Sequence, residues 1–193
     1  MSEKLAHFGF RVLYTIPMRF VIPEVVASQF HLRPGDKVAD FGAGSGFFMK
    51  VLSDTVGPTG RVYACEIQKP LVEKLGDQCR LQALENIEPL WCDIEAVNGS
   101  KIATDTLDAG ILVNTLFQLE ERGVAAVELQ RVLRAGGKLL IVDWSETVAG
   151  LGPTPDRLVT ADDCKVLFES HGFVFEREFP AGEHHYGLAF RAV

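Results

Sequence analysis

Apolar and polar positions alternate along the chain in blocks that predict short buried strands separated by helices. Near-continuously apolar runs predict strands at residues 38–41, 61–66, 87–92, 107–114 and 138–144. The stretches between them predict helices at about 47–55, 70–84 and 119–133. Strands that are apolar on both faces and alternate with helices are typical of a parallel sheet covered on both sides.

Glycine and proline residues mark where these elements begin and end. Gly57 and Pro58 are expected to end the first helix, and Pro70 to begin the second. Gly136 and Gly137 are expected to close the third helix before the next strand. Two arginines near the end of that helix, Arg131 and Arg134, are expected to favour its C-terminal dipole.

The end of the chain breaks the alternation of strand and helix. Thr160 is a candidate N-cap for a helix that runs to about His171, and Gly172 ends it. Two β-patterned runs follow directly, at residues 174–179 and 186–192. Because so few residues connect them, they are expected to form a hairpin, which makes the last strand antiparallel to the rest of the sheet.

Composition narrows the class of protein. A chain of 193 residues that is 47% hydrophobic is long enough for one well-buried core, so we expect a single domain. The net charge of −7 disfavours general attraction to nucleic acid, although it leaves a local basic groove possible. The four cysteines form no C-x-x-C pair, which favours reduced thiols in a cytoplasmic protein and no metal site.

The N-terminal region is apolar but interrupted by charges. Residues 8–26 contain Arg11, Arg19, Glu24 and two prolines, so the pattern fits neither a membrane span nor a signal peptide. We expect no stable membrane insertion. Its aromatic and aliphatic residues are too many for a free tail, so we expect residues 1–34 to belong to the same domain as residues 35–193. The pattern leaves the oligomeric state open.

Candidate chemistry begins at the end of the first strand. Asp40 is followed by Gly42, Gly44 and Gly46, which allow positive φ and leave no Cβ between the backbone and a ligand. The helix expected next directs its free N–H groups toward the same place.

Polar side chains also end the next three strands. Glu66 ends the second strand, Asp93 follows the third and Asn114 ends the fourth. In a parallel sheet these ends lie along one edge, where ligands bind. A carboxylate such as Glu66 can accept hydrogen bonds from both ribose hydroxyls. Asp93 can accept a hydrogen bond from the exocyclic amine of an adenine whose ring lies between Ile67 and Ile94.

The segments 38–46, 64–66, 92–94 and 133–139 resemble the class I S-adenosylmethionine-dependent methyltransferases, and the resemblance covers roughly residues 30–193. It implies an α/β three-layer sandwich with a seven-stranded, mostly parallel sheet whose last strand is antiparallel, the Rossmann-like methyltransferase fold. It also implies S-adenosyl-L-methionine as cofactor and S-adenosyl-L-homocysteine as product. The resemblance further implies that residues 1–34 form a helical lid, with residues 14–20 lining an apolar acceptor pocket; plain packing of a helix on the sheet is the alternative. The cofactor-binding residues implied are Asp40, Gly42, Ala43, Gly44, Gly46, Glu66, Ile67, Asp93, Ile94 and Asn114.

The acceptor is less clearly indicated. The second half of the chain is most similar to small-molecule and quinone-type methyltransferases, which favours a small or apolar acceptor. Residues 114–117 lack the two prolines found in many methyltransferases of base amines, so base methylation is not favoured. Residues 56–64 also resemble fibrillarin-type RNA and isoaspartyl protein methyltransferases, so RNA or protein remains an alternative acceptor.

Two other functions were weighed against methyl transfer. A dinucleotide-binding fingerprint needs glycine where this chain has Phe47, counted from Gly42, or Met49, counted from Gly44. That departure disfavours a dehydrogenase. A non-catalytic S-adenosylmethionine-binding protein stays open, because cofactor residues and catalytic residues are different sets.

No catalytic residue is clearly indicated. His184 and His185 are candidates for a general base, since neutral histidine suits that role near pH 7. Asp143, at the end of the fifth strand, is a further candidate. Its neighbour Trp144 is expected to close the core.

Overall fold

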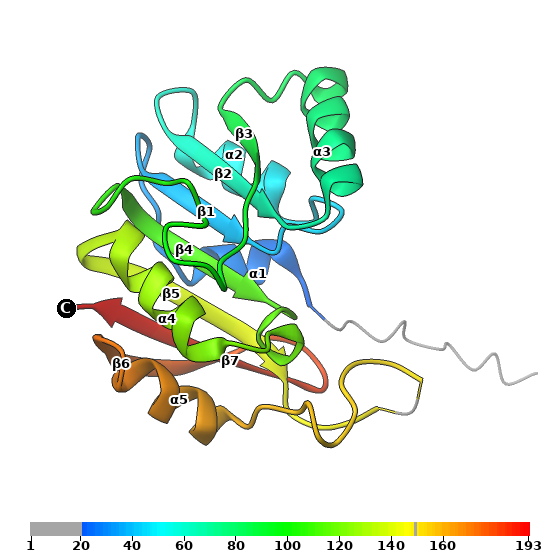
Figure 1. Ribbon diagram of the computed structural model, residues 1–193. Helices are drawn as coiled ribbons and strands as arrows, with labels where there is room; N and C mark the ends of the chain where they lie inside the picture. Colours follow the sequence, from blue (N-terminus) through cyan, green and yellow to red (C-terminus); the bar gives the residue numbers. More distant parts are fainter. Residues whose placement is uncertain (1–20, 149) are drawn as a thin grey trace, which may run out of the picture.

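A computed structural model describes residues 21–148 and 150–193 of the chain. Its centre is a seven-stranded sheet with the order β3-β2-β1-β4-β5-β7-β6 (Figure 1). The strands are β1 (Lys37–Phe41), β2 (Arg61–Glu66), β3 (Ile87–Trp91), β4 (Leu107–Val113), β5 (Leu133–Trp144), β6 (Phe173–Pro180) and β7 (His185–Ala192).

Strand direction follows the predicted pattern. The pairings among β1 to β5 are all parallel. The last strand, β7, is antiparallel to both β5 and β6. The predicted hairpin and the predicted antiparallel last strand are therefore confirmed.

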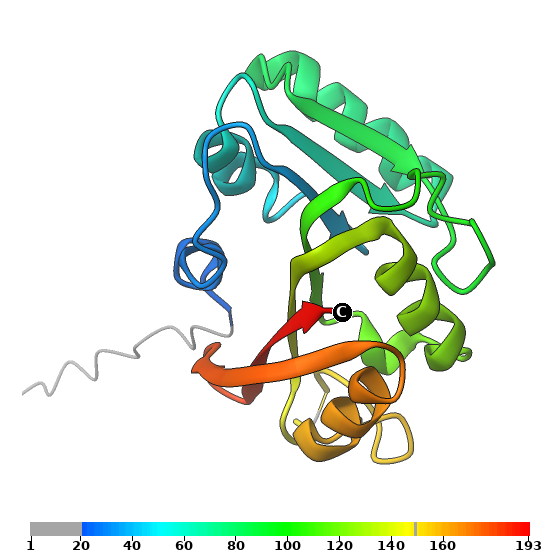
Figure 2. The ribbon, with the colours of Figure 1, turned by 90° about the vertical axis from the view of Figure 1, so that its left-hand side faces the viewer.

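Helices cover both faces of the sheet and make three layers (Figure 2). The helices α1 (Pro23–Ser28), α2 (Met49–Val56) and α3 (Lys69–Gln82) pack on one face. The helices α4 (Arg122–Val132) and α5 (Ala161–Glu169) pack on the other. A 3-10 turn, η1 (Leu116–Gln118), follows β4. Each face buries its own apolar cluster, because the strand side chains alternate between the two sides.

The predicted end of the third helix, at about residue 133, is close to the observed end of α4, but the role predicted for the two glycines after it was wrong. Helix α4 ends at Val132, and Gly136 and Gly137 lie inside β5. The register with β4 shifts there, from the pair Leu107 and Leu133 to the pair Ala109 and Lys138. Gly136 has φ +77°, so these glycines allow a bulge in the strand instead of ending a helix.

The predicted role of two arginines changes with this boundary. Arg134 lies in β5, where its Nε is 2.7 Å from Asp108 Oδ1. Arg131 stays on α4 but is paired with Glu128, with Nη2 2.7 Å from Oε1. Arg134 lies outside the helix, so the dipole role predicted for it was wrong, whereas Arg131 lies in the last turn of α4 as expected and in addition pairs with a specific carboxylate.

The predicted lid falls largely outside the described residues. Residues 1–20, including the predicted acceptor-lining stretch 14–20, are not described. From residue 21 onward, α1 buries Val26 and Ala27 against the face that carries α2. Lys138 Nζ in β5 donates to the carbonyl of Phe30 at 2.7 Å, which ties the segment after α1 to the sheet.

The described part of the chain contains no helix with enough length and apolar character to cross a membrane.

Phe190 in β7 generates a stability prediction. Its side chain is fully buried, and its ring lies 5.5 Å from Phe168 and 5.8 Å from Phe175, centroid to centroid. Phe190→Ala is expected to lower the free energy of unfolding by about 3–5 kcal/mol, because it leaves a cavity between α5 and the sheet. Urea denaturation measures the loss. The control is Phe175→Ala, whose side chain is only partly buried; an equal loss in both variants would contradict the assignment.

Candidate active site

A cavity of about 290 Å³ opens at the carboxyl ends of β1, β2, β3 and β4. Seven of the residues expected to bind the cofactor line it: Gly42, Gly44, Glu66, Ile67, Asp93, Ile94 and Asn114. The other three, Asp40, Ala43 and Gly46, are not among its lining residues. The structure therefore brings most of the predicted set around one space, while their binding roles remain predictions.

The glycines of the loop after β1 have different reasons to be glycine. All three adopt positive φ. A Cβ on Gly42 would collide with the side chain of Thr115, and one on Gly46 would lie 2.6 Å from Met49 Cε. A Cβ on Gly44 would meet nothing nearer than 3.9 Å. Gly42 and Gly46 thus permit close packing, and Gly44 leaves its backbone open to a ligand.

Glu66 is held rigidly beside that loop. Its Oε2 accepts from the Gly44 N–H at 3.0 Å, and its Oε1 accepts from the Gln68 N–H at 2.9 Å. The side chain is buried yet lines the cavity. Each oxygen keeps a second lone pair for a ligand hydroxyl.

Trp91 supports the wall next to Glu66 and was missed in the sequence. Its Nε1–H donates to the carbonyl of Ile67 at 2.8 Å. The ammonium groups of Lys69 and Lys101 lie 4.5 and 4.1 Å from its ring centroid. The sequence placed Trp91 near the end of a strand, but its contact with Ile67 depends on the pairing of β2 with β3 and could not be predicted.

Asp40 lies behind the glycine loop. It is 3% exposed, and its Oδ2 has no hydrogen-bond partner among the described residues. Burial, with a smaller contribution from the nearby Glu66, raises the pKa of Asp40 to about 7. Its carboxyl group is therefore costly to ionise in the folded protein.

The segment after β3 forms the opposite wall. Asp93 Oδ1 accepts from the Glu95 N–H at 2.9 Å, which fixes the carboxylate in a local turn. Ile94 is buried, whereas Ile67 across the cavity is 54% exposed. Glu95 also lines the cavity, and its Oε1 accepts from the backbone N–H of Glu120 at 2.6 Å.

Asn114 closes the floor beside β4. Its backbone is left-handed, with φ +52°, and its buried Oδ1 has no hydrogen-bond partner among the described residues. The carbonyl of Asn114 accepts from Gln118 Nε2 at 2.6 Å. A strained residue with an unsatisfied buried acceptor is well suited to receive a hydrogen bond from a ligand.

Asp143 supports the turn after β4 and does not line the cavity. Its Oδ2 accepts from the Phe117 N–H at 3.3 Å. Burial raises the pKa of Asp143 to about 6, while backbone donors from Trp144 and Phe117 oppose the shift. The position favours a supporting role over direct contact with a ligand.

The two histidines lie farther along the same edge of the sheet, outside the cavity lining. His184 Nδ1 is 2.7 Å from Glu146 Oε1. The His185 ring lies 4.4 Å from the Trp144 ring, centroid to centroid, and both side chains are buried. Burial lowers the pKa of His185, so this imidazole is neutral at pH 7. The prediction that Trp144 closes the core is confirmed by its burial.

Several cavity residues were not predicted. They lie next to predicted positions in the sequence. They could have been predicted because residues that follow the carboxyl ends of neighbouring parallel strands lie along one edge of the sheet. These residues are Cys65, Gln68, Leu71, Cys92, Glu95, Val113, Thr115, Gln118 and Leu119.

A sequence profile of the methyltransferase domain matches residues 39–141, which is more than half of the chain. The chain belongs to the methyltransferase domain family. The match confirms the resemblance to class I S-adenosylmethionine-dependent methyltransferases that the sequence showed. The cofactor of that family is S-adenosylmethionine. The dehydrogenase alternative is discarded.

Curated relatives and solved structures extend the comparison. The chain is 29% identical over 120 residues to the ubiquinone/menaquinone biosynthesis C-methyltransferase UbiE of Burkholderia multivorans, covering 62% of this chain and 47% of the relative. The chain thus spans about half the length of this relative. A UbiE of Bordetella parapertussis is 24% identical, covering 80% of this chain and 69% of the relative.

Among solved structures, an S-adenosylmethionine-dependent methyltransferase from Aquifex aeolicus superposes with a TM-score of 0.83 and 27% identity, covering 91% of this chain and 92% of that one. The [4+2]-cyclase SpnF has a TM-score of 0.76 and 16% identity, covering 88% and 80%. The cyclase shares the fold alone, so the fold by itself does not determine the reaction.

The burial of Asp40 leads to a prediction of how stability depends on pH. The carboxyl keeps its proton up to about pH 7 in the folded chain, whereas its ordinary pKa is 3.8. The folded state therefore loses stability as the pH rises from about 4 to 7. Asp40→Asn cannot ionise, so at pH 8 it is expected to be more stable than the wild type by roughly 4 kcal/mol, a gain that disappears toward pH 4.

Urea denaturation of both proteins across this pH range is the measurement. Asp54→Asn is the control, because Asp54 is exposed on α2. A stability difference for Asp40→Asn that does not change with pH would contradict the raised pKa.

Proposed function

We propose that the protein transfers the methyl group of S-adenosylmethionine to a small, apolar molecule. The observation that carries the proposal is the tethered carboxylate of Glu66 beside the open backbone of Gly44, in the cavity at the carboxyl ends of β1 to β4. The free cysteines support a cytoplasmic location.

The residues around the cavity fit this cofactor. Glu66 offers acceptors for the two ribose hydroxyls, and Asp93 offers one for the adenine amine, with Ile67 and Ile94 as apolar walls. The unsatisfied Oδ1 of Asn114 offers an acceptor where the floor meets β4. A ligand donor there would replace the hydrogen bond to water that burial removed.

S-adenosylmethionine, when bound, supplies the electrophilic methyl group. The protein then has to bind the acceptor, exclude water and align it. We assign the acceptor to the same edge of the sheet, on the β5 side of the cavity, because β5 directly neighbours β4. The neutral His185 has the protonation state of a base, which suits an acceptor that must lose a proton.

Two observations support a small acceptor over RNA or protein. The relatives UbiE are named for ubiquinone and menaquinone biosynthesis, whose products are apolar. The net charge of −7 disfavours non-specific contact with nucleic acid.

The cofactor role of Glu66 is tested by binding. Glu66→Ala is expected to weaken the binding of S-adenosylmethionine by more than about 1 kcal/mol, since charge-assisted hydrogen bonds are lost. Isothermal titration measures the affinity. Glu73→Ala, at an exposed position on α3, is the control and should bind as the wild type does. Equal binding by the Glu66 variant and the wild type would count against the assignment.

The acceptor site is tested by turnover. Trp144→Ala is expected to lower kcat/KM for a benzoquinol or naphthoquinol acceptor about tenfold while the cofactor still binds, because the buried ring that packs against His185 is lost. Trp144→Phe should recover part of this activity. Transfer of labelled methyl groups is the measurement, and cofactor binding without transfer to any acceptor would favour a non-catalytic binding protein.

A further inference from the structure

The connection from β3 to β4 is an irregular segment, residues 92–106, that contains no helix. Three of its residues that are not glycine, Asn98, Lys101 and Asp105, have positive φ. Such conformations persist only where the surrounding structure holds them in place. Because the same segment carries Asp93 and Ile94, whatever holds it also sets one wall of the cavity.

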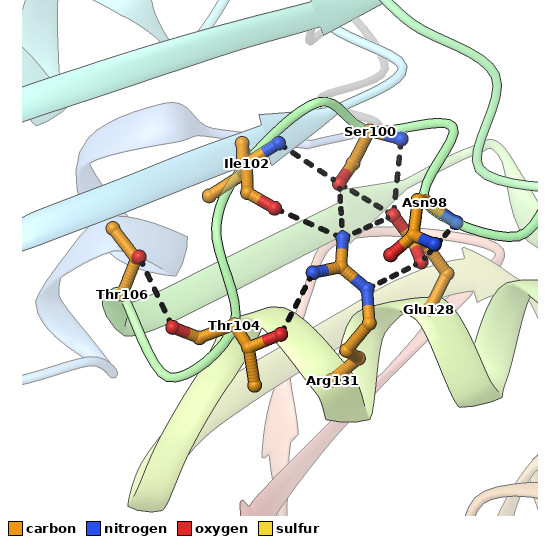
Figure 3. A network of polar contacts seen from close by, with 7 residues as sticks. All are labelled: Asn98, Ser100, Ile102, Thr104, Thr106, Glu128 and Arg131. Atoms are coloured by element: carbon orange, nitrogen blue, oxygen red, sulfur yellow. Dashed lines mark hydrogen bonds and ion pairs between the residues drawn. The ribbon is translucent and has the colours of Figure 1, made fainter.

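Glu128 on α4 holds this segment through the backbone (Figure 3). Its side chain is 2% exposed. The carboxylate accepts from the N–H of Asn98 at 3.1 Å, the N–H of Ser100 at 3.0 Å and the hydroxyl of Ser100 at 2.5 Å. One carboxylate thus fixes the residues on both sides of Gly99.

Arg131, one turn further along α4, completes the network (Figure 3). Its guanidinium makes two bonds to Glu128, Nε to Oε2 at 2.9 Å and Nη2 to Oε1 at 2.7 Å. It also donates to the carbonyl of Ile102 at 2.9 Å and to the hydroxyl of Thr104 at 3.1 Å. The pair therefore spans residues 98–104 of the segment.

A short path of hydrogen bonds leads from Glu128 to Asp93. The carbonyl of Gly99 accepts from the Asp93 N–H at 3.1 Å. A Cβ on Gly99 would collide with the carbonyl oxygen of Asp93, so the two backbones are in close contact. A shift of residues 98–100 away from Glu128 would therefore displace Asp93.

We propose that Glu128 and Arg131 are positioning residues for adenine recognition, which they control by holding residues 98–104 so that Asp93 faces the adenine amine. The inference rests on the proposed function. Neither Glu128 nor Arg131 lines the cavity, so the effect passes through the segment. A buried ion pair by itself adds little to the free energy of unfolding. The role we assign to this pair is therefore to hold residues 98–104 in one conformation.

The ionisation of Glu128 is consistent with this role. Burial alone raises the pKa of a carboxyl, but hydrogen bonds from Arg131 and Ser100 outweigh it and lower the pKa of Glu128 to about 2. Glu128 remains charged at neutral pH, and the network stays intact.

The experiment compares two ligands. S-adenosylhomocysteine carries the adenine amine, and S-inosylhomocysteine has an oxygen in its place. The wild type is expected to prefer the adenosyl ligand. Glu128→Gln should weaken adenosyl binding about tenfold, within the range reported for residues that couple two sites, and leave inosyl binding nearly unchanged. Arg131→Lys, which keeps the charge but loses the fork, should show the same loss of preference if Glu128→Gln does not fold.

Leu129→Ala on the same helix is the matched control. Leu129 is fully buried in the core, so this variant loses stability without removing a polar contact of the segment. It is expected to keep the preference for the adenosyl ligand. An unchanged preference in folded Glu128→Gln or Arg131→Lys overturns the inference.

Hydrogen exchange separates this inference from the proposed function. The amides of residues 93–101 should exchange faster in Glu128→Gln than in Leu129→Ala, without any ligand present. Unchanged exchange in Glu128→Gln overturns the positioning role whatever the ligands do. A wild type that binds neither ligand overturns the proposed function, and the adenine inference with it.

Discussion

The parallel pairing of β1 with β2 on one side and with β4 on the other is the constraint on which the site depends. The chain runs outward from β1 to β3 and returns on the far side of β1 to form β4. At this reversal the carboxyl ends of the strands leave a crevice. Gly42 fits because Thr115, from the turn after β4, occupies the space where a Cβ would lie. The glycine loop and the floor of the cavity are therefore packed against each other directly.

The buried carboxylates near this crevice differ in pKa, and the difference depends on which hydrogen-bond donors contact each one. Burial and the nearby Glu66 raise the pKa of Asp40, and burial raises the pKa of Asp143 because it outweighs the backbone donors there. Glu128 is as deeply buried, but an arginine and a serine donate to it and its pKa falls. Glu66 takes its donors from the backbone of the two loops that it joins. Local donors thus decide which acidic groups hold charge near the cavity.

Much of the fold could be predicted because strand and helix signals were local. The apolar runs gave the positions of the strands among β1 to β5, and the short connection between β6 and β7 gave the antiparallel hairpin. Gly136 was misread because a glycine pair can end a helix or permit a bulge, and only the register with β4 decides between them. The polar partners of Arg131 could not be predicted, because besides Glu128 they include residues 100–104, about thirty positions away in the sequence.

The sequence by itself determined the order of elements, the glycine loop and the polar residues at the ends of successive strands, because these follow from local periodicity and backbone preference. Only the tertiary structure decided which of those residues face one cavity, that Asp40 lies behind it, and that Trp91 and Glu128 support its walls. The physical reason is that burial, strand register and hydrogen bonds between distant segments exist only once the sheet has assembled.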